Sequence, residues 1–215
     1  MTEGLRARKK RETAARISGV AIGLFVERGF DAVTIAEVAE AADVSVNTVY
    51  NHFRTKEDLV LPPEEASPGR LAEMVRARGL GVSAAHAVLG RLRAEVRGRE
   101  RTVGLTEGFG RVLPMMLAAP TLAARLGELG TRMTGELAAL LAEEAGTGPD
   151  DRVPGLVAAQ IGWVHNLVYA EIGRHVVAGK RPDAVAAAAE ELLDAVEGLL
   201  GERVLTYAVK EEDRS

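Results

Sequence analysis

Four polar side chains near residue 48 could make hydrogen bonds from one side of a short helix. Asn47 and Asn51 carry amides, while Ser45 and Thr48 carry hydroxyls. An asparagine amide can pair bidentately with adenine, and threonine can offer its hydroxyl or meet a thymine methyl group. The residue types and spacing therefore predict a helix face suited to the edges of base pairs.

Three further side chains follow near the end of the same segment: Tyr50, His52 and Lys56. Side chains at the end of a helix that lies against a duplex reach phosphates more readily than base edges. We therefore predict phosphate contacts from these three residues. The alternative is that all seven are ordinary solvated side chains of a surface helix, and the sequence leaves it open.

Two short helices are predicted to position these groups. Apolar residues recur at steps of three, four and seven, which indicates one buried stripe per helix; they are Ile35, Val38 and Ala39, then Val46, Val49 and Phe53. Thr34 and Ser45 stand where N-caps belong, and Glu37 completes a capping box with Thr34. Asp43 tolerates the backbone angles of a tight turn. The pattern is a helix-turn-helix, whose second helix enters the major groove.

Several short stretches together resemble the N-terminal domain of the TetR family of bacterial transcriptional regulators. They are Gly29-Phe30, Thr34–Ala39, Val44-Ser45, Thr48–Phe53 and Lys56–Leu59. The resemblance implies an all-helical homodimer with three N-terminal helices for DNA and a larger helical domain that senses a small molecule. It also implies phosphate contacts at Thr34, Tyr50, His52 and Lys56, and base contacts at the start of the second helix.

Two positions depart from the family's pattern. Asp43 stands in the turn where the family often has glycine, and Asn47 replaces the glycine that often precedes Thr48. The change at Asn47 predicts a base preference of its own, so operator sequences of relatives should not be transferred to this chain.

Composition and charge favour a helical, soluble protein. Of the 215 residues, 47% are apolar, 27% charged and only 4% aromatic, and this balance favours helices over strands. The net charge is −4, but residues 1–16 hold six basic and two acidic side chains, and charge distribution matters more than the total for DNA binding. Residues 1–9 are predicted to be a flexible basic arm, either a solubilising tail or an arm that follows phosphates or the minor groove.

The sequence lacks the residues that several kinds of site and reaction require. There is no cysteine, which removes disulfides, thiolate zinc sites and cysteine nucleophiles. We find no HxxxH or HExxH spacing, glycine-rich phosphate loop or GxSxG elbow, so we expect no metal, no cofactor and no enzyme activity. No apolar run of about 18 residues is present, and the protein is expected to be cytoplasmic without a membrane partner.

The predicted organisation is a DNA-binding domain at 1–60 and a regulatory and dimerisation domain at 61–215. Helices are expected near residues 10–28, 67–78, 83–99, 106–118, 120–145, 151–178 and 182–200, before a polar tail. Pro62, Pro63 and Pro68 interrupt the segment 61–69, where the family usually has a continuous helix. Coupling between the domains is therefore expected to be looser, or to run through the helix near 67–78.

The last two helices, within 151–200, are predicted to form a homodimer interface. The first of them is apolar on two opposite sides, with Ile161, Val168, Ile172 and Val176 on one and Trp163, Leu167 and Ala170 on the other. A helix that is apolar all round must be buried all round. A four-helix interface between two chains would bury it, and a deep monomeric core is the alternative.

A ligand pocket is expected in the second domain, mostly apolar with a few polar anchors. The candidates are Phe109, Met115, Met116, Met133, Trp163, Asn166 and Tyr169; the alternative is that they fill the core. Methionine adapts to irregular shapes, which favours a small apolar effector. His165 is expected to be a hydrogen-bonded core residue, with a ligand contact as the alternative.

The predicted function is a ligand-responsive repressor that binds a palindromic operator as a dimer; the alternative is an architectural or ligand-independent DNA-binding protein.

Overall fold

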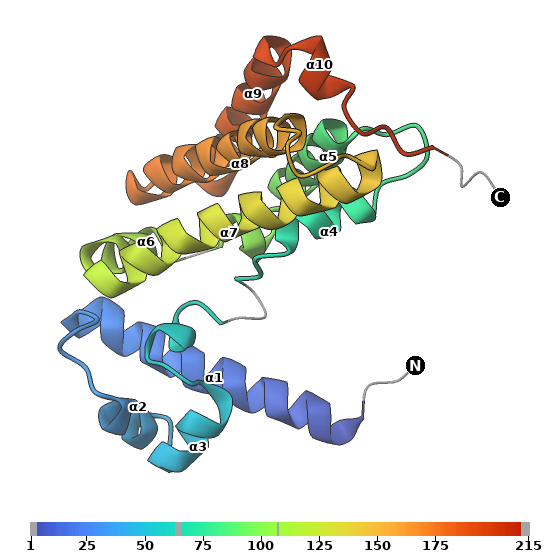
Figure 1. Cartoon of the computed structure of the whole chain (residues 1–215). Helices are drawn as coiled ribbons and strands as arrows, with labels where there is room; N and C mark the ends of the chain where they lie inside the picture. Colours follow the sequence, from blue (N-terminus) through green and yellow to red (C-terminus); the bar gives the residue numbers. More distant parts are fainter. Residues whose placement is uncertain (1–3, 63–65, 107, 212–215) are drawn as a thin grey trace. The chain divides into compact units, whose positions relative to one another are not determined.

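The protein is all-helical over the residues that the structure describes, which are 4–62, 66–106 and 108–211 of a computed structural model. Figure 1 shows the elements in chain order. They are α1 (Leu5–Arg28), α2 (Ile35–Ala41), α3 (Val46–His52), the 3₁₀ turn η1 (Glu57–Leu59), α4 (Arg70–Arg76), α5 (Ala84–Gly98), the 3₁₀ turn η2 (Arg101–Val103), α6 (Phe109–Ala118), α7 (Pro120–Ala145), α8 (Val153–Val177), α9 (Pro182–Leu199) and α10 (Glu202–Leu205). The predicted all-α fold class is confirmed.

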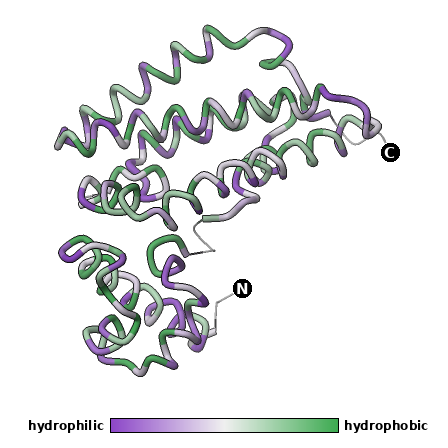
Figure 2. Tube along the Cα trace, turned by 60° about the vertical axis from the view of Figure 1, so that its left-hand side comes forward, coloured by the Kyte–Doolittle hydropathy of each residue, from purple (hydrophilic) through white to green (hydrophobic). Residues whose placement is uncertain are grey.

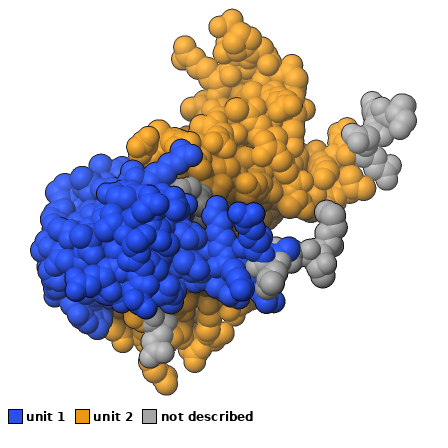
Figure 3. Space-filling view, turned by 90° about the horizontal axis from the view of Figure 1, so that it is seen from below, with its two compact units in different colours: residues 1–66, 111–125 blue, residues 67–110, 126–215 orange. Residues whose placement is uncertain are grey.

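Contacts divide the chain into two compact units, coloured separately in Figure 3. Unit 1 holds residues 1–66 and 111–125, and unit 2 holds residues 67–110 and 126–215. Unit 1 therefore includes most of α6 and the start of α7 as well as the N-terminal helices. The predicted domain boundary after residue 60 stays a prediction.

Helix α1 supplies the apolar base of unit 1. Ile17, Ala21 and Phe25 are each 0% exposed, and their spacing of four residues places them on one side of the helix. Gly29 ends α1 with φ 89°, in the region that glycine enters without a Cβ penalty. The predicted stop at Gly29 is therefore confirmed.

Two predictions for the N-terminal segment are wrong in part: where α1 starts, and that residues 1–9 form a flexible arm. The helix begins at Leu5 rather than near Lys10, so residues 5–9 are helical, and residues 1–3 lie outside the described residues. Arginine, alanine and lysine are strong helix formers, and Arg8 lies 3.6 Å from Glu12 across one helical turn. These local preferences extend the helix through the basic segment.

Unit 2 is built around α5, α8 and α9, which pack against one another. One continuous apolar core joins them to α4, α7 and α10, and along each helix hydrophobic and hydrophilic residues alternate as a buried stripe requires (Figure 2). The long helices predicted near 83–99, 120–145, 151–178 and 182–200 are confirmed to within a few residues.

Three elements after residue 61 differ from their predictions. Helix α4 is shorter than predicted because Pro68 and Gly69 precede it, and α6 begins only at Phe109, after Gly108 at φ 85°. The polar tail is not all irregular, since α10 forms within it. Val204 of α10 is buried, and the backbone of Lys210 exchanges hydrogen bonds with Gly81 and Val82 at 2.9 and 3.1 Å.

The proline-rich segment interrupts the chain as predicted over the part that the structure describes. Only the single turn η1 follows α3 before α4 begins at Arg70; Pro63 lies outside the described residues. Among the helices that are described, none is alone long and apolar enough to cross a membrane, although α6 and α7, bent by 99°, pass that test together on length and composition.

Candidate nucleic-acid interface

The turn between α2 and α3 has the backbone geometry that its residue types predict. Asp43 adopts a left-handed conformation with φ 51°, which aspartate tolerates better than most residues. The amides of Asp43 and Val44 donate to the carbonyls of Glu40 and Ala39, both at 3.0 Å. Arg16 of α1 also donates to the Ala42 carbonyl, so the turn is held from the first helix. Sequence reasoning missed Arg16, because nothing local relates it to a turn 26 residues away.

Helix α2 begins with the predicted capping box. The Thr34 hydroxyl accepts from the Glu37 amide at 3.2 Å, and Glu37 Oε2 accepts from the Thr34 amide at 2.7 Å. Arg28 adds an ion pair to Glu37 at 2.5 Å. The backbone hydrogen bond from Thr34 and then the Arg28 bond lower the pKa of Glu37 to about 2. The Thr34 hydroxyl also donates to Glu37, so a phosphate at Thr34 would have to share that hydroxyl.

Helix α3 presents its polar residues on the side away from the core. Asn47, Tyr50 and Asn51 are exposed, and their three- and four-residue spacing groups them on one face. Val49 is 0% exposed and Phe53 is 5% exposed, so the opposite face packs inward as predicted. The structure therefore brings both predicted base-reading amides to one accessible surface.

The start of α3 carries the predicted N-cap. Ser45 Oγ accepts from the Thr48 amide at 3.0 Å and lies 2.8 Å from the Thr48 hydroxyl. Thr48 is half-buried, and these contacts partly engage it within the helix. Val46 was predicted to face inward, and this is wrong, because its side chain is 41% exposed. It occupies the first position of a seven-residue helix, and the apolar surface beneath α3 does not reach that far.

Lys56 is positioned differently from a solvated phosphate-binding lysine. Its ammonium donates to the Phe30 carbonyl and lies 4.4 and 5.4 Å from the ring centres of Phe30 and Phe25. Cation–π attraction and the hydrogen bond both hold it there. Lys56 therefore ties the turn after α3 to the end of α1, a contact that the sequence pattern did not reveal.

His52 is half-buried at the end of α3. Burial and then the nearby charge of Lys10 lower the pKa of His52 below its usual value of 6.5. At neutral pH the ring is therefore uncharged, and a phosphate contact at His52 would be a neutral hydrogen bond. The influence of Lys10 also shows that the basic first turns of α1 lie near this end of α3.

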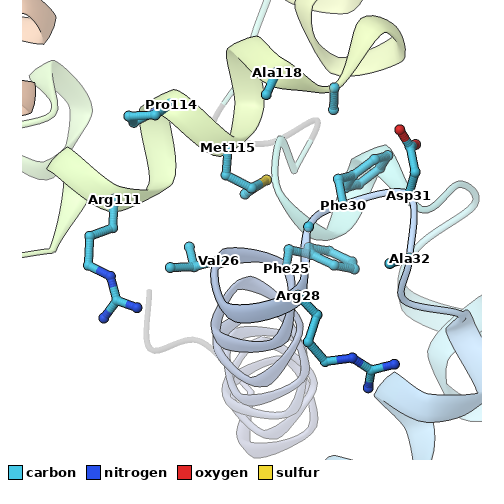
Figure 4. A pocket seen from close by; sticks show the side chains of 12 residues that line it. Phe25, Val26, Arg28, Phe30, Asp31, Ala32, Arg111, Pro114, Met115 and Ala118 are labelled. Carbon is cyan, nitrogen blue, oxygen red and sulfur yellow. The ribbon is translucent and has the colours of Figure 1, made fainter.

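An open pocket of about 560 Å³ lies within unit 1, between the end of α1 and the residues of α6 that belong to this unit. Met115 of α6 points toward Phe25 and Phe30 (Figure 4). Of the seven predicted ligand residues, Met115 lines this pocket, and Met116 belongs to the same unit.

The other predicted ligand residues belong to unit 2, and their role in a pocket stays a prediction. Phe109, Met133, Asn166 and Tyr169 differ in exposure from buried to exposed. Trp163 is 53% exposed on α8 in the single chain, and its predicted role in the pocket stays a prediction. In the described parts of the chain no cluster of three or more His, Cys, Asp or Glu side chains could hold a metal ion.

Comparison with known proteins agrees with this geometry. Residues 17–61 match the family described as bacterial regulatory proteins, tetR family. The regulator TcmR of Streptomyces glaucescens is 33% identical over 153 residues, which cover 69% of this chain and 67% of that protein. The regulator AcrR of Shigella flexneri is 35% identical over 63 residues, 29% of each chain.

Solved structures share the fold. NalD of Pseudomonas aeruginosa, described as the secondary repressor of a multidrug efflux pump, superposes with a TM-score of 0.60 at 18% identity, covering 90% of this chain and 98% of that one. A SmeT–triclosan complex gives a TM-score of 0.59 at 16% identity, covering 95% and 100%.

The helix-turn-helix, the all-helical fold and these relatives define the class as DNA-binding transcriptional regulators. The chain belongs to the TetR family of bacterial regulatory proteins. Regulators of this family bind operator DNA and small-molecule effectors and act as dimers. The relatives matched by sequence are named as regulators rather than enzymes.

Proposed function

We propose that this protein is a ligand-responsive repressor that binds a palindromic operator as a homodimer in the cytoplasm. The observation that carries the proposal is the exposed amide face of α3, where Asn47 and Asn51 stand one helical turn apart. Two amides at this spacing can each pair with a base edge in the major groove.

In this proposal the side chains of the helix-turn-helix have two roles. Asn47, Thr48 and Asn51 contact base edges, and Ser45 fixes the helix start that presents them. Thr34, Tyr50, His52 and Lys56 contact phosphates. His52 is half-buried and neutral, and Lys56 is held by the Phe30 carbonyl, whereas Thr34 and Tyr50 are exposed.

The proposed dimer uses the outer faces of α8 and α9. Four apolar residues of α8 recur every seven positions and are exposed in the single chain: Leu156, Trp163, Ala170 and Val177. On α9, Leu199 is 82% exposed. Exposed apolar side chains at heptad spacing form the seam of helical interfaces, and a patch of this kind indicates a partner. A two-fold dimer would then match half-sites about one helical turn apart, or a multiple of it.

The proposed switch is an effector that binds within unit 2 and favours a dimer geometry in which the two α3 helices no longer fit one operator. A coupling free energy of about 1–3 kcal/mol is enough to change operator occupancy substantially.

Selection of bound sequences from a random DNA pool tests the proposal directly. We expect an enriched palindrome, whereas the absence of any enriched sequence would favour an architectural DNA-binding protein. On the recovered site, Asn47→Ala should lose about 1–3 kcal/mol of binding free energy and relax base preference. Fluorescence anisotropy with specific and random duplexes measures this difference.

Thr131→Ala is the control, because Thr131 is an exposed polar residue of unit 2 with no part in the proposed DNA or effector contacts. It should leave both affinities unchanged. Equal losses on specific and random DNA for Asn47→Ala would show that Asn47 does not contact bases.

A further inference from the structure

A polar cluster is buried within the helical core of unit 2. At its centre Glu95 of α5 is 0% exposed and accepts from Arg70 of α4 at 2.5 Å and from Arg91 at 2.8 Å. Burying a carboxylate is costly unless it is paired and hydrogen-bonded. Both Glu95 oxygens are satisfied, so the charge of this group is balanced inside the protein.

Two side chains of α8 complete the cluster. The rings of His165 and Tyr169 stack with centroids 4.4 Å apart, and the Tyr169 hydroxyl donates to the Thr102 carbonyl at 2.6 Å. The charge of Arg70 acts on both His165 and Tyr169, which places the guanidinium beside the two rings. Four separate segments of unit 2 therefore converge on one polar site.

Two atoms of this site have no hydrogen-bond partner. They are Arg70 Nε and His165 Nε2, and both are buried; His165 as a whole is only 7% exposed. Buried polar groups in folded proteins are nearly always hydrogen-bonded, so such exceptions call for an explanation. Here both exceptions belong to one cluster, in the unit to which a regulator of this family would bind its effector.

The chemistry of the two atoms restricts what could satisfy them. Arg70 Nε–H is a donor and needs an oxygen acceptor, whereas an imidazole Nε2 donates or accepts according to its tautomer. Burial first, and then the charge of Arg70, lower the pKa of His165 to about 4, so the ring is neutral at pH 7. One hydroxyl group can accept from Arg70 and donate to His165.

An anionic group fits this site less well. Arg70 and Arg91 both pair with Glu95, and Arg91 also pairs with Glu100 at 3.4 Å, so two carboxylates already match the two guanidinium charges. A further anion would lie near the fully buried Glu95 carboxylate. Like charges in a poorly solvated site repel strongly. The cluster therefore suits an uncharged oxygen function rather than a carboxylate.

We propose that the effector is an uncharged, mostly apolar molecule that carries a hydroxyl or phenol group, bound by Arg70 Nε and His165 Nε2. This inference rests on the proposed ligand-responsive function and specifies its ligand. Ile161 and Val168, one helical turn from His165 on the same side of α8, are buried and apolar, which agrees with a mostly apolar molecule.

Three probes of one shape test the inference: naphthalene, 2-naphthol and 2-naphthoate. Thermal shift and isothermal calorimetry of the full chain should show 2-naphthol binding roughly tenfold more tightly than naphthalene, a discrimination within reach of two hydrogen bonds. It should also bind more tightly than 2-naphthoate. Equal binding of 2-naphthol and naphthalene, tighter binding of 2-naphthoate, or no binding of any probe overturns the inference.

Two variants test the assigned atoms. His165→Leu removes Nε2, and Arg70→Lys keeps a positive charge beside Glu95 while it removes Nε. Each should reduce the preference for 2-naphthol over naphthalene to less than about threefold, since one hydrogen bond is lost. His86→Leu is the matched control, because His86 is exposed and lies outside the cluster, and it should keep the full preference.

A preference that persists in both folded variants, as judged by circular dichroism, overturns the assignment to these atoms. Operator binding measured on the same samples separates this inference from the proposed function. Sequence-specific DNA binding without a 2-naphthol preference overturns only the effector class. A 2-naphthol preference without sequence-specific DNA binding supports the site and overturns the repressor function.

Discussion

Arg125 of α7 forms an ion pair with Asp58, the buried carboxylate that organises the turn behind α3. Asp58 Oδ2 accepts from the amides of Arg54 and Thr55 at 3.0 and 3.1 Å, and Arg125 also donates to the Thr55 hydroxyl at 3.0 Å. Helix α7 is continuous from Pro120 to Ala145, although its residues up to Arg125 belong to unit 1 and the rest to unit 2. Arg125 is thus the last residue of unit 1 on a helix that continues into unit 2.

Arg125→Gln should lower the free energy of unfolding by about 1–3 kcal/mol, because it leaves a buried carboxylate without its ion partner. Burial raises the pKa of Asp58, but the Thr55 backbone bond and Arg125 outweigh burial and hold the pKa below its usual 3.8. The stabilisation by Asp58 is therefore present above pH 4 and lost as pH falls through the lowered folded pKa. In the variant the loss should begin at higher pH.

Urea unfolding at several pH values measures this effect. Arg174→Gln is the control, because the Arg174 side chain is 69% exposed in its pair with Glu171 and exposed pairs contribute little. If both variants lost the same stability at every pH, the Arg125–Asp58 pair would have no special role in unit 1.

Lys56→Met should change both stability and DNA binding. Loss of the Phe30 hydrogen bond and of the ring contacts should cost about 1–3 kcal/mol of unfolding free energy. If Lys56 also contacts a phosphate, the slope of log affinity against log salt should fall by about one ion. An unchanged slope would restrict Lys56 to its structural contact. Lys180→Met, at an exposed lysine of unit 2, should alter neither quantity.

Trp163→Lys should dissociate the proposed dimer. A buried charge replaces an anchoring aromatic side chain, and central aromatic residues often contribute more than about 2 kcal/mol to an interface, so the dimer dissociation constant should rise by at least about thirtyfold. Sedimentation velocity measures the change, with Ala94→Lys on the exposed side of α5 as control. A Trp163→Lys protein that remains dimeric would place the interface elsewhere.

Glycine substitutions within α8 should have opposite effects. A methyl group at Gly162 would overlap Thr134 Oγ1 of α7, whereas one at Gly155 would meet nothing within 4 Å. Gly155→Ala should stabilise the protein by about 0.5–1 kcal/mol through helix propensity, and Gly162→Ala should destabilise it by about 1–3 kcal/mol through overpacking. Thermal unfolding measures both. Thr134→Ala should rescue Gly162→Ala, and a failure of rescue would contradict this packing.

Stability should fall in mild acid through His165. The unfolded chain protonates this histidine near pH 6.5, whereas burial lowers its folded pKa to about 4. The neutral ring therefore favours the folded state above pH 6.5, and this contribution is lost as pH falls from 6.5 toward 4, by on the order of 3 kcal/mol. Relative to His86→Leu, His165→Leu should flatten the pH dependence of unfolding over this range; parallel curves would refute the effect.

The caps, turns and helix ends could be predicted from the sequence, because they depend on residues within about four positions of one another. The capping box of Thr34, the N-cap of Ser45, the turn at Asp43 and the stop at Gly29 all follow from such neighbours, and each is confirmed. The same near-neighbour patterns carried the family resemblance and the bounds of α5, α7, α8 and α9.

Only the tertiary structure decided which distant groups meet. Arg70 and Glu95 are 25 residues apart, Lys56 and Phe30 are 26 apart, and Arg125 and Asp58 are 67 apart. Neither periodicity nor capping constrains such pairs, since their contact depends on how separate helices pack. For the same reason the exposure of Val46 and Trp163 could not be derived from their hydrophobicity, because a side chain is buried only where a neighbouring helix covers it.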